Sequence, residues 1–314
     1  MELMELRRMW GGFQASRVIM TANELGFFEK LVKPRTSPEC ARLLKCDPRG
    51  TEILLDALAG IGLMKKTRNM YRNTPVCNRY LVKGKPLYQG DILRHTAHIY
   101  ERWGNLDQVV STGKPAPRRD DGFEAFIMGM HNLSISRSPE LLKAIGLRGV
   151  KTALDLGAGP GTHAINMSRK GIKATIFDMP ETISIAKKVV RKEGAKGIRY
   201  IPGNFHYDDI GSGYDLILMS QVLHSNSPQE CAALIKKCAS VLNPGGTIAV
   251  HEFPLDETRT KPPVGALFAI NMLVSTPGGR TFAPSEIKGW MKAAGLKGMK
   301  QTMLSETMLI TGRL

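Results

Sequence analysis

Cysteine is scarce in this sequence, and its spacing excludes two common kinds of site. The 314 residues contain five cysteines, and no two of them form a CxxC pair. An odd number of scattered cysteines indicates neither a zinc site nor a disulfide framework. We therefore expect free thiols and no bound metal ion.

Long apolar runs are also missing, which bears on where the chain resides. No stretch is long and apolar enough to predict a membrane-spanning helix. The first residues, MELMELRR, include glutamates, whereas the start of a signal peptide carries only basic charges. With reduced thiols expected as well, the chain is predicted to be cytoplasmic.

Acidic residues are few compared with basic ones. The sequence has 44 Lys and Arg against 28 Asp and Glu, a formal net charge of +16. Such a charge favours contact with nucleic acid, an anionic membrane surface or acidic small molecules. The basic residues occur in scattered pairs, such as Lys65-Lys66, Arg118-Arg119 and Lys187-Lys188, without the long run of a nucleic-acid-binding tail. We interpret them as a solvated basic surface.

Residues 1–113 have the pattern of a mostly helical domain. Apolar residues recur at helical spacing from Leu6 to Leu31. Two short helices are predicted next, the first capped by Ser37 and the second opened by Asp47-Pro48, followed by a ribbon that turns at Arg68-Asn69. Helix, helix and two-stranded ribbon in this order are typical of a winged helix.

The pattern changes after a proline-bearing connector, Lys114 to Asp121. In residues 114–314, strand-like apolar runs alternate with helical segments, which is typical of a mostly parallel sheet covered by helices on both faces. The expected strands are Thr152–Leu156, Ala174–Phe177, Ile198–Ile201, Leu216–Met219 and Thr247–Val250. We predict two domains, a helical one over 1–113 and a Rossmann-like α/β domain over 114–314.

A glycine-rich turn follows the first expected strand. It places Gly157, Gly159 and Gly161 at alternate positions, where glycine permits a sharp turn and the close approach of a ligand. A dinucleotide-binding turn needs Gly-x-Gly-x-x-Gly, but here the last of these positions is Thr162. Asp155, just before the turn, suits a cationic amino group better than a pyrophosphate. The pattern therefore favours a ligand with a methionine moiety over a nicotinamide dinucleotide.

The next two expected strands end in side chains that suit the rest of such a ligand. Asp178 ends one strand, where an acid accepts hydrogen bonds from ribose hydroxyls in nucleotide-binding folds. After the other strand, Asn204 offers an amide oxygen to an adenine amino group, and Phe205 offers an apolar face.

Eight segments together resemble the bacterial and plant O-methyltransferases that join a winged-helix dimerisation domain to a class I methyltransferase domain. They are GFQASRVIMTANELGFFEKL, YRNTP, LDLGAGPGTHAINMSRKG, FDMPE, PGNF, DLILMSQVLHSNSPQE, LNPGG and NMLVSTPGGRTF. The resemblance covers nearly the whole chain. It implies the cofactor S-adenosylmethionine (SAM), a small-molecule acceptor and a homodimer built by the N-terminal domain.

The resemblance also implies which residues bind the cofactor. The expected cofactor-binding residues are Asp155, Gly157, Gly159, Gly161, Asp178, Met179, Asn204, Phe205 and Ser220. Family members usually have Asp where Asn204 stands, and the amide keeps the acceptor oxygen. In the dimer, the segment Phe13 to Met20 is expected to approach the pocket of the partner, because its apolar face has no obvious partner in its own sequence neighbourhood.

His224 is the predicted general base for methyl transfer to a hydroxyl. It follows the fourth expected strand, at the edge where open sheets bind ligands, and it falls on the position of the family's catalytic base. The family commonly reads His-Asp-Trp-Ser-Asp, whereas here Ser225 follows the histidine. Glu252 is expected to keep one acidic position near the base, and Thr281 replaces another. Missing acids weaken a histidine base, so carbon, nitrogen and sulfur acceptors stay open.

Apolar and polar side chains outside these motifs are candidates for the acceptor pocket. The candidates are Trp103, Phe126, Met130, His131, Met272 and Arg280. Phe123 and Phe268 are further apolar residues that suit the wall of such a pocket. His251, beside Glu252, is expected to point to the opposite face of its strand and to be structural.

Other functions compete with methylation of a small molecule. The basic charge and the winged helix suggest a DNA-binding regulator, but the second helix of the motif is acidic and apolar, which suits packing rather than contact with bases. A methyltransferase for RNA or protein, and a protein that binds ligands without catalysis, also stay open. Nucleic acid is not the expected partner.

Overall fold

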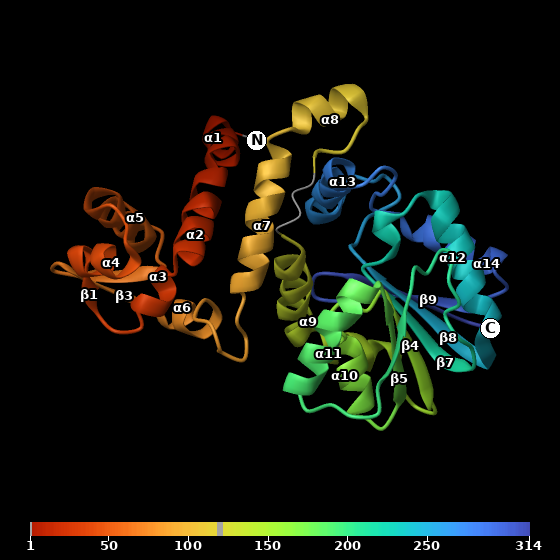
Figure 1. Ribbon diagram of the computed structural model, residues 1–314. Coiled ribbons are helices and arrows are strands. Elements are labelled where there is room, and N and C mark those ends of the chain that lie inside the picture. Colours follow the sequence, from red (N-terminus) through yellow and green to blue (C-terminus); the bar gives the residue numbers. More distant parts are fainter. Residues whose placement is uncertain (1, 118–121) are drawn as a thin grey trace. The chain divides into compact units, whose positions relative to one another are not determined.

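The computed structural model describes residues 2–117 and 122–314, which fold into two compact units (Figure 1). The long helix α9 (Phe123–Ile145) contributes to both units. The N-terminal unit comprises Met1–Tyr100 with Asp121–Leu133, and the C-terminal unit comprises Glu101–Asp120 with Ser134–Leu314. The pair Arg118-Arg119 and part of the expected connector lie outside the described residues, and the domain boundary after residue 113 stays a prediction.

Short helices and a small sheet build the N-terminal unit. The helices are α1 (Leu3–Gly11), α2 (Phe13–Leu25), α3 (Phe27–Lys30), α4 (Ser37–Leu44), α5 (Pro48–Gly60), α6 (Pro75–Tyr80) and α7 (Gly90–Trp103), whose end from Glu101 onward belongs to the C-terminal unit. The antiparallel sheet has the strand order β1-β3-β2, with β1 (Arg35–Thr36), β2 (Met64–Thr67) and β3 (Met70–Asn73). The predicted ribbon is confirmed, and its classification as part of a winged helix stays a prediction.

Capping residues set where the helices of this unit begin. Asp47 accepts a hydrogen bond from the backbone N–H of Gly50 and so caps α5, as expected. The prediction for α4 was wrong by one residue. Thr36, not Ser37, is its cap, because Thr36 accepts from the N–H of Glu39 while the Glu39 carboxylate accepts from the N–H of Thr36. Buried Phe27, Phe28, Leu55, Leu58 and Tyr71 form the centre of the core.

The N-terminal helices expose apolar side chains, but not over the whole segment that was expected. In α2, Met20 is only 5 % exposed, and Val18 and Ile19 pack against the core of their own unit. The expectation that Phe13 to Met20 lacks a partner nearby is therefore wrong for the second half of that segment. The exposed apolar residues lie on α1 and at the start of α2, and they are Leu3, Met4, Leu6, Met9, Trp10 and Phe13.

A seven-stranded sheet with helices on both faces forms the C-terminal unit. The strands are β4 (Thr152–Leu156), β5 (Lys173–Asp178), β6 (Arg199–Pro202), β7 (Tyr214–Ser220), β8 (Leu242–Glu252), β9 (Lys297–Met303) and β10 (Met308–Arg313). The helices are α8 (Leu106–Thr112), α10 (Thr162–Ser168), α11 (Pro180–Lys192), α12 (Pro228–Ser240), α13 (Pro263–Ser275) and α14 (Pro284–Ala293), with a 3-10 turn, η2, at Leu223–Ser225. All five expected strands are confirmed, and the antiparallel hairpin of β9 and β10 was missed.

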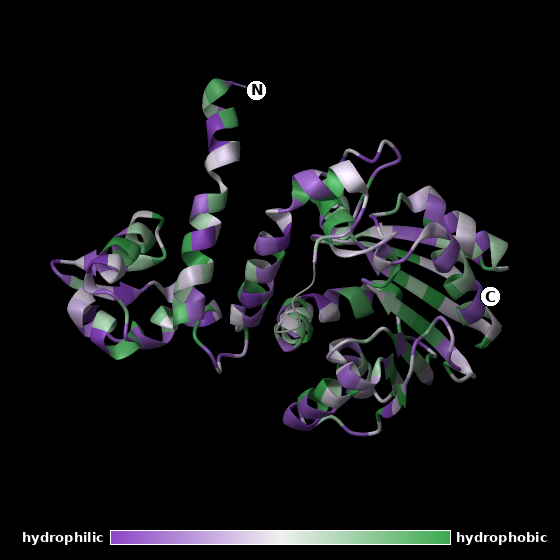
Figure 2. Ribbon diagram, turned by 45° about the horizontal axis from the view of Figure 1, so that its top comes forward, coloured by the Kyte–Doolittle hydropathy of each residue, from purple (hydrophilic) through white to green (hydrophobic). Residues whose placement is uncertain are grey.

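The strand order of this sheet is β6-β5-β4-β7-β8-β10-β9, and the first five of these strands are parallel. The central strands are largely hydrophobic, as Figure 2 shows in green. The chain adds β5 and β6 on one side of β4 and then returns to add β7 and β8 on the other. In open α/β sheets, ligands bind at such a reversal, beyond the carboxyl ends of the strands. No helix of the described part of the chain is long and apolar enough to cross a membrane.

Candidate active site

The predicted cofactor residues gather at one edge of the large sheet. Because β4 to β8 are parallel, their carboxyl ends share an edge, and the turns after these strands meet there. The glycine turn follows β4, Asp178 ends β5, Asn204 follows β6, and Ser220 ends β7. The sequence therefore placed the strand ends correctly, and the fold brings them together at the reversal between β4 and β7.

The glycine turn needs glycine for two different reasons. All three glycines have positive φ angles, +64° at Gly157, +54° at Gly159 and +76° at Gly161, which other residues rarely adopt. A Cβ on Gly157 would also lie 2.8 Å from Cγ2 of Val222, and one on Gly161 would lie 2.4 Å from Cδ1 of Ile176. Beside Gly159 nothing lies within 4 Å of the Cβ position, so this glycine borders open space.

Asp178 ties the end of β5 to the glycine turn. One carboxylate oxygen accepts from the N–H of Gly159 and the other from the N–H of Met179, both at 2.8 Å. Burial raises the pKa of this carboxyl above its usual value. The side chain of Thr182 also hydrogen-bonds to this carboxylate. A carboxylate has about four acceptor positions, so one position is left for a ribose hydroxyl.

Asp155 has an unsatisfied acceptor inside the unit. Its side chain is 1 % exposed, and one oxygen accepts from the N–H of Ala164 at 3.0 Å. The other oxygen is buried without a hydrogen-bond partner. Burial, together with the nearby charge of Asp178, raises the pKa of Asp155 to about 8. A buried acceptor without a donor is costly, and a cationic amino group is the kind of ligand that would satisfy it.

Asn204 and Phe205 form the part of the site after β6. The Asn204 side-chain oxygen accepts from the N–H of His206 at 3.0 Å, which leaves one lone pair for a ligand. The Phe205 ring reaches the glycine turn, where its Cε1 lies 3.8 Å from the Cβ position of Gly157. The apolar face expected of Phe205 therefore lies next to the turn.

His224 and Glu252 form a hydrogen-bonded pair. Nδ1 of His224 lies 2.7 Å from Oε2 of Glu252, and both side chains are largely buried. The other oxygen of Glu252 accepts from the backbone N–H groups of Leu223 and His224, at 2.9 and 3.3 Å. Glu252 thus fixes both the turn η2 and the imidazole ring. With Nδ1–H donating to the carboxylate, Nε2 is left as the basic nitrogen.

His224 was expected to be a weak base because acidic partners are missing, and the hydrogen bond to Glu252 partly offsets this weakness. Glu252 does supply the acidic partner that the sequence proposed for it. Thr281 replaces the second acid with a hydroxyl, which is buried and donates to the backbone oxygen of Gly265. Close packing also fixes the turn, because a Cβ on Gly279 would lie 2.4 Å from the carbonyl oxygen of His224.

An aromatic pair adjoins His224. The Phe268 ring lies edge-on to the imidazole with 4.8 Å between centroids, and Phe253 stacks on Phe268 at 3.7 Å. Phe268 was named from the sequence only as a general pocket residue, and Phe253 was not identified. Nothing in the sequence pattern distinguishes Phe253 from a core residue, since it follows a buried strand.

The candidate residues for the acceptor pocket are divided between the two units. In the C-terminal unit, Trp103 donates to the side chain of Asn271 at 3.3 Å, and Met272 is buried on α13. Arg280 pairs with Glu286 at 2.6 Å, so its charge is already compensated. The other candidates belong to the part of α9 in the N-terminal unit, and they are Phe126, Met130 and His131.

Two buried histidines were missed as parts of the site. His163 and His251 both hydrogen-bond to the hydroxyl of Ser220, at 3.2 and 2.8 Å. His251 does point away from Glu252 into the interior, as expected, and it is 3 % exposed. The position of His163, directly after the glycine turn and Thr162, was the available signal in the sequence.

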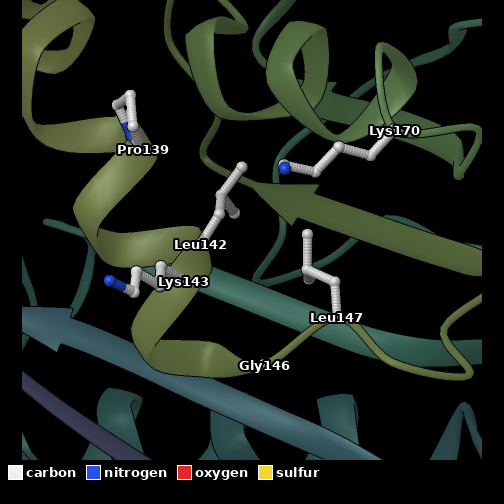
Figure 3. A pocket seen from close by; sticks show the side chains of 6 residues that line it. All are labelled: Pro139, Leu142, Lys143, Gly146, Leu147 and Lys170. Carbon is white, nitrogen blue, oxygen red and sulfur yellow. The ribbon is translucent and has the colours of Figure 1, made fainter.

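A separate cavity of about 250 Å³ lies between α9 and the end of α10 (Figure 3). It is lined by Pro139, Leu142, Lys143, Gly146, Leu147 and Lys170. None of the predicted site residues contributes to it. Its position away from the carboxyl edge of the sheet separates it from the candidate active site.

Comparisons with known proteins agree with this geometry. The family model for the O-methyltransferase domain matches residues 111–297, and the model for the O-methyltransferase dimerisation domain matches residues 8–83. The chain is 30 % identical to 3-hydroxy-5-methyl-1-naphthoate 3-O-methyltransferase of Streptomyces sahachiroi, over 90 % of this chain and 86 % of that protein. It is 30 % identical to human acetylserotonin O-methyltransferase, over 91 % and 90 %. The crystal structure of human N-acetylserotonin methyltransferase with SAM superposes with a TM-score of 0.90, at 29 % identity, covering 98 % of this chain and 96 % of that one.

The buried titratable groups predict a stability maximum near neutral pH. Burial lowers the pKa of His163 to about 4 and of His251 to about 3, and it raises that of Asp155 to about 8. From about pH 6.5 down to about 4, the unfolded chain binds two protons on these histidines, whereas the folded chain keeps one on Asp155. The difference of one proton lowers the free energy of unfolding by about 1.4 kcal/mol per pH unit as pH falls.

Above about pH 6.5, Asp155 is the one of these three groups whose proton differs between the folded and unfolded states, so its contribution to stability should fall as pH rises towards 8. Urea unfolding of the ligand-free protein between pH 4.5 and 8.5 measures the profile. Asp155→Asn keeps an acceptor for the N–H of Ala164. It should abolish the alkaline decline and, because the folded chain then keeps no proton at this position, steepen the acid limb to about 2.7 kcal/mol per pH unit. A parent protein whose stability is flat from pH 4.5 to 6.5 would contradict the neutral state of the two histidines.

Proposed function

The chain belongs to the O-methyltransferase family, and on that premise we propose that it transfers the methyl group of SAM to a hydroxyl of a small aromatic molecule, with His224 as general base. The observation that carries the proposal is the His224–Glu252 hydrogen bond, at the same sheet edge as the glycine turn. Although Ser225 stands where an acid was expected after His224, the imidazole still has a carboxylate partner in Glu252.

The residues around the glycine turn suit the parts of SAM. Asp155 offers its unpaired oxygen to the cationic amino group, and Asp178 offers a lone pair to a ribose hydroxyl. Asn204 and Phe205 offer an acceptor and an apolar face to adenine. When bound, SAM supplies a methyl group on a positively charged sulfur, which is displaced in line by the acceptor oxygen.

His224 removes the proton of the acceptor hydroxyl in this reaction. As the new oxygen–carbon bond forms, Nε2 takes the hydroxyl proton, and the resulting imidazolium keeps its Nδ1–H on Glu252. The carboxylate stabilises that charge and holds the ring in place. The base therefore acts without a second acid at the position of Thr281.

The aromatic pair beside His224 supports an aromatic acceptor. Phe253 and Phe268 stack on each other, and the edge of Phe268 faces the imidazole. Flat aromatic molecules pack well against such rings. The naphthoate and acetylserotonin named for the relatives are aromatic too.

Self-association is supported by the dimerisation-domain match and by the exposed apolar residues of α1. The match covers residues 8–83, and Met9 and Trp10 are 65 % and 59 % exposed. Several apolar side chains exposed within two short helices are typical of a protein–protein contact. We infer a homodimer in which α1 and the start of α2 are buried.

A nucleic-acid partner is not part of the proposal. The carboxylate of Asp56, on the second helix of the motif, lies 2.6 Å from Lys66 and 2.7 Å from the hydroxyl of Tyr71. This helix is thus joined to its own ribbon, and it carries acid where contact with DNA needs basic or amide groups. The cytoplasmic location stays a prediction.

The cofactor assignment is tested at Asp178. Asp178→Ala removes the charge-assisted acceptor for ribose and should weaken the binding of S-adenosylhomocysteine by about 1.5–3 kcal/mol. Isothermal titration calorimetry measures the change. Asp215→Ala is the matched control, because Asp215 hydrogen-bonds Lys151, Thr152 and Asn243 within the fold. Equal affinity in the parent and Asp178→Ala would refute the ribose site.

The base is tested at His224 and Glu252. His224→Ala should leave SAM affinity intact and lower turnover by roughly 10²–10⁴-fold, the usual contribution of a positioned base. Glu252→Gln should also lower turnover, because its amide N–H₂ facing Nδ1 would favour the tautomer with a proton on Nε2. Turnover close to that of the parent in both variants would leave positioning alone as the source of catalysis.

The dimer is tested by matched methionine substitutions. Met9→Glu places a charge on the exposed face of α1 and should shift the protein from dimer to monomer in sedimentation velocity at micromolar concentration. Met303 is 58 % exposed on the edge strand β9, and Met303→Glu should leave the dimer intact. A monomeric parent protein, or a dimer unaffected by Met9→Glu, would exclude this interface.

A further inference from the structure

A chain of hydrogen bonds between side chains runs beneath the end of β7. Nδ1 of His163 lies 3.0 Å from the hydroxyl of Ser138, and its Nε2 lies 3.2 Å from that of Ser220. Nδ1 of His251 lies 2.8 Å from the same Ser220 hydroxyl, and its Nε2 lies 2.7 Å from that of Thr307. The chain thus joins α9, α10, β7, β8 and Thr307, the residue before β10.

Both imidazole rings have their two nitrogens occupied by neutral hydroxyls. Ser138 is fully buried, and His163, His251 and Thr307 are each at most 5 % exposed. The rings lie edge to face, 6.3 Å apart, so two positive charges would repel each other at this distance without water to screen them. The chain is therefore a neutral network, and no step of methyl transfer uses its protons.

Ser220 is the member of this network that reaches the sheet edge. It is the last residue of β7, pairs in register with His251, and is less buried than the other four members. A serine hydroxyl has one donor and two acceptor positions. Two of the three are used by the imidazoles, so one position remains for a ligand. Free serine side chains sample three rotamers, whereas this hydroxyl is held from two sides.

We propose that His163 and His251 are positioning residues for the cofactor, which hold the Ser220 hydroxyl in the orientation that contacts SAM. Fixing a contact group before binding lowers the entropy lost when the ligand arrives, which raises affinity without a new contact. This inference rests on the proposed placement of Ser220 in the cofactor site.

Asparagine and glutamine test each ring nitrogen separately. The amide of asparagine reaches the place of Nδ1, and that of glutamine reaches the place of Nε2. His251→Asn and His163→Gln therefore keep the bond to Ser220, whereas His251→Gln and His163→Asn keep only the bond to Thr307 or Ser138. If the histidines were only structural, there would be no reason for asparagine to preserve cofactor affinity at position 251 while glutamine preserves it at position 163.

The readout is the dissociation constant of S-adenosylhomocysteine measured by calorimetry, with the melting temperature of every variant recorded. We expect His251→Gln and His163→Asn to bind about three- to tenfold more weakly than their partner variants, the effect of one hydrogen bond. In a Ser220→Ala background, asparagine and glutamine should become equivalent at both positions, because the group they position is gone.

Each failure has a separate meaning. A parent protein that does not bind S-adenosylhomocysteine would refute the proposed function itself. Unchanged affinity in Ser220→Ala would overturn the inference about the histidines while leaving methyl transfer intact. Equal affinities for asparagine and glutamine in the parent background would overturn it as well. Because two histidines give two independent pairs, a single variant that fails to fold does not prevent the test.

Discussion

Parallel pairing of β4 with β5 and β7 is the constraint on which the candidate site depends. Parallel strands present their carboxyl ends at one edge, and the reversal at β4 leaves room there between two diverging turns. Hydrogen bonds then lock these turns together. The Asp178 carboxylate holds the N–H of Gly159 after β4, and the Glu252 carboxylate holds the N–H of Leu223 after β7. Each acid therefore fixes the turn that follows a neighbouring strand. Asp178 itself can still accept from a ligand, and Glu252 leaves Nε2 of His224 free for one.

The sequence predicted those parts of the fold that depend on local pattern. Buried parallel strands are short continuous apolar runs, and all five were found. The prediction for β8 was too short, because this strand begins at Leu242 and not at Thr247. The hairpin of β9 and β10 was missed because β9 (Lys297–Met303) is an edge strand with few buried residues, so it shows no apolar run. The cap of α4 was misplaced by one residue because Thr36 and Ser37 can both cap a helix, and the Glu39 side chain, which completes a capping box with Thr36, decides between them.

The site was predictable where a motif fixes a strand end, and less so where contacts cross the sheet. Asp178 ends β5 and His224 lies in the turn η2 shortly after β7, so pattern and resemblance located them. The bond between His224 and Glu252 joins residues that are 28 apart and needs the register of β7 with β8. Phe253 and His251 gave no pattern of their own, because an isolated aromatic residue or histidine at a buried strand is compatible with plain packing. His163 follows the glycine turn and Thr162, and this signal was not used.

Several buried polar atoms of the C-terminal unit lack partners, and they lie on residues at the ends of its strands or just beyond α13. They are Oδ1 of Asp155, Nε2 of Gln221 and Nε of Arg280. Gln221, which follows Ser220 at the end of β7, also has a φ of +61°, a strained value for a residue other than glycine. Unpaired polar groups and strain lower stability, and they persist where the surrounding structure holds them in place. Unpaired polar atoms and backbone strain near the candidate site are consistent with a bound ligand supplying the missing hydrogen-bond partners.

Three histidines of this unit show how surroundings give one side chain different roles. His224 has a carboxylate on one nitrogen and leaves the other free, so a proton taken up there is stabilised. His163 and His251 have only hydroxyl partners and almost no exposure, and burial lowers the pKa of both below the usual range. A charge on either would have no compensating anion nearby in the hydrogen-bond chain. In the proposed reaction, proton transfer therefore belongs to His224, which Glu252 supports, whereas His163 and His251 are proposed to act as neutral supports of the strand end.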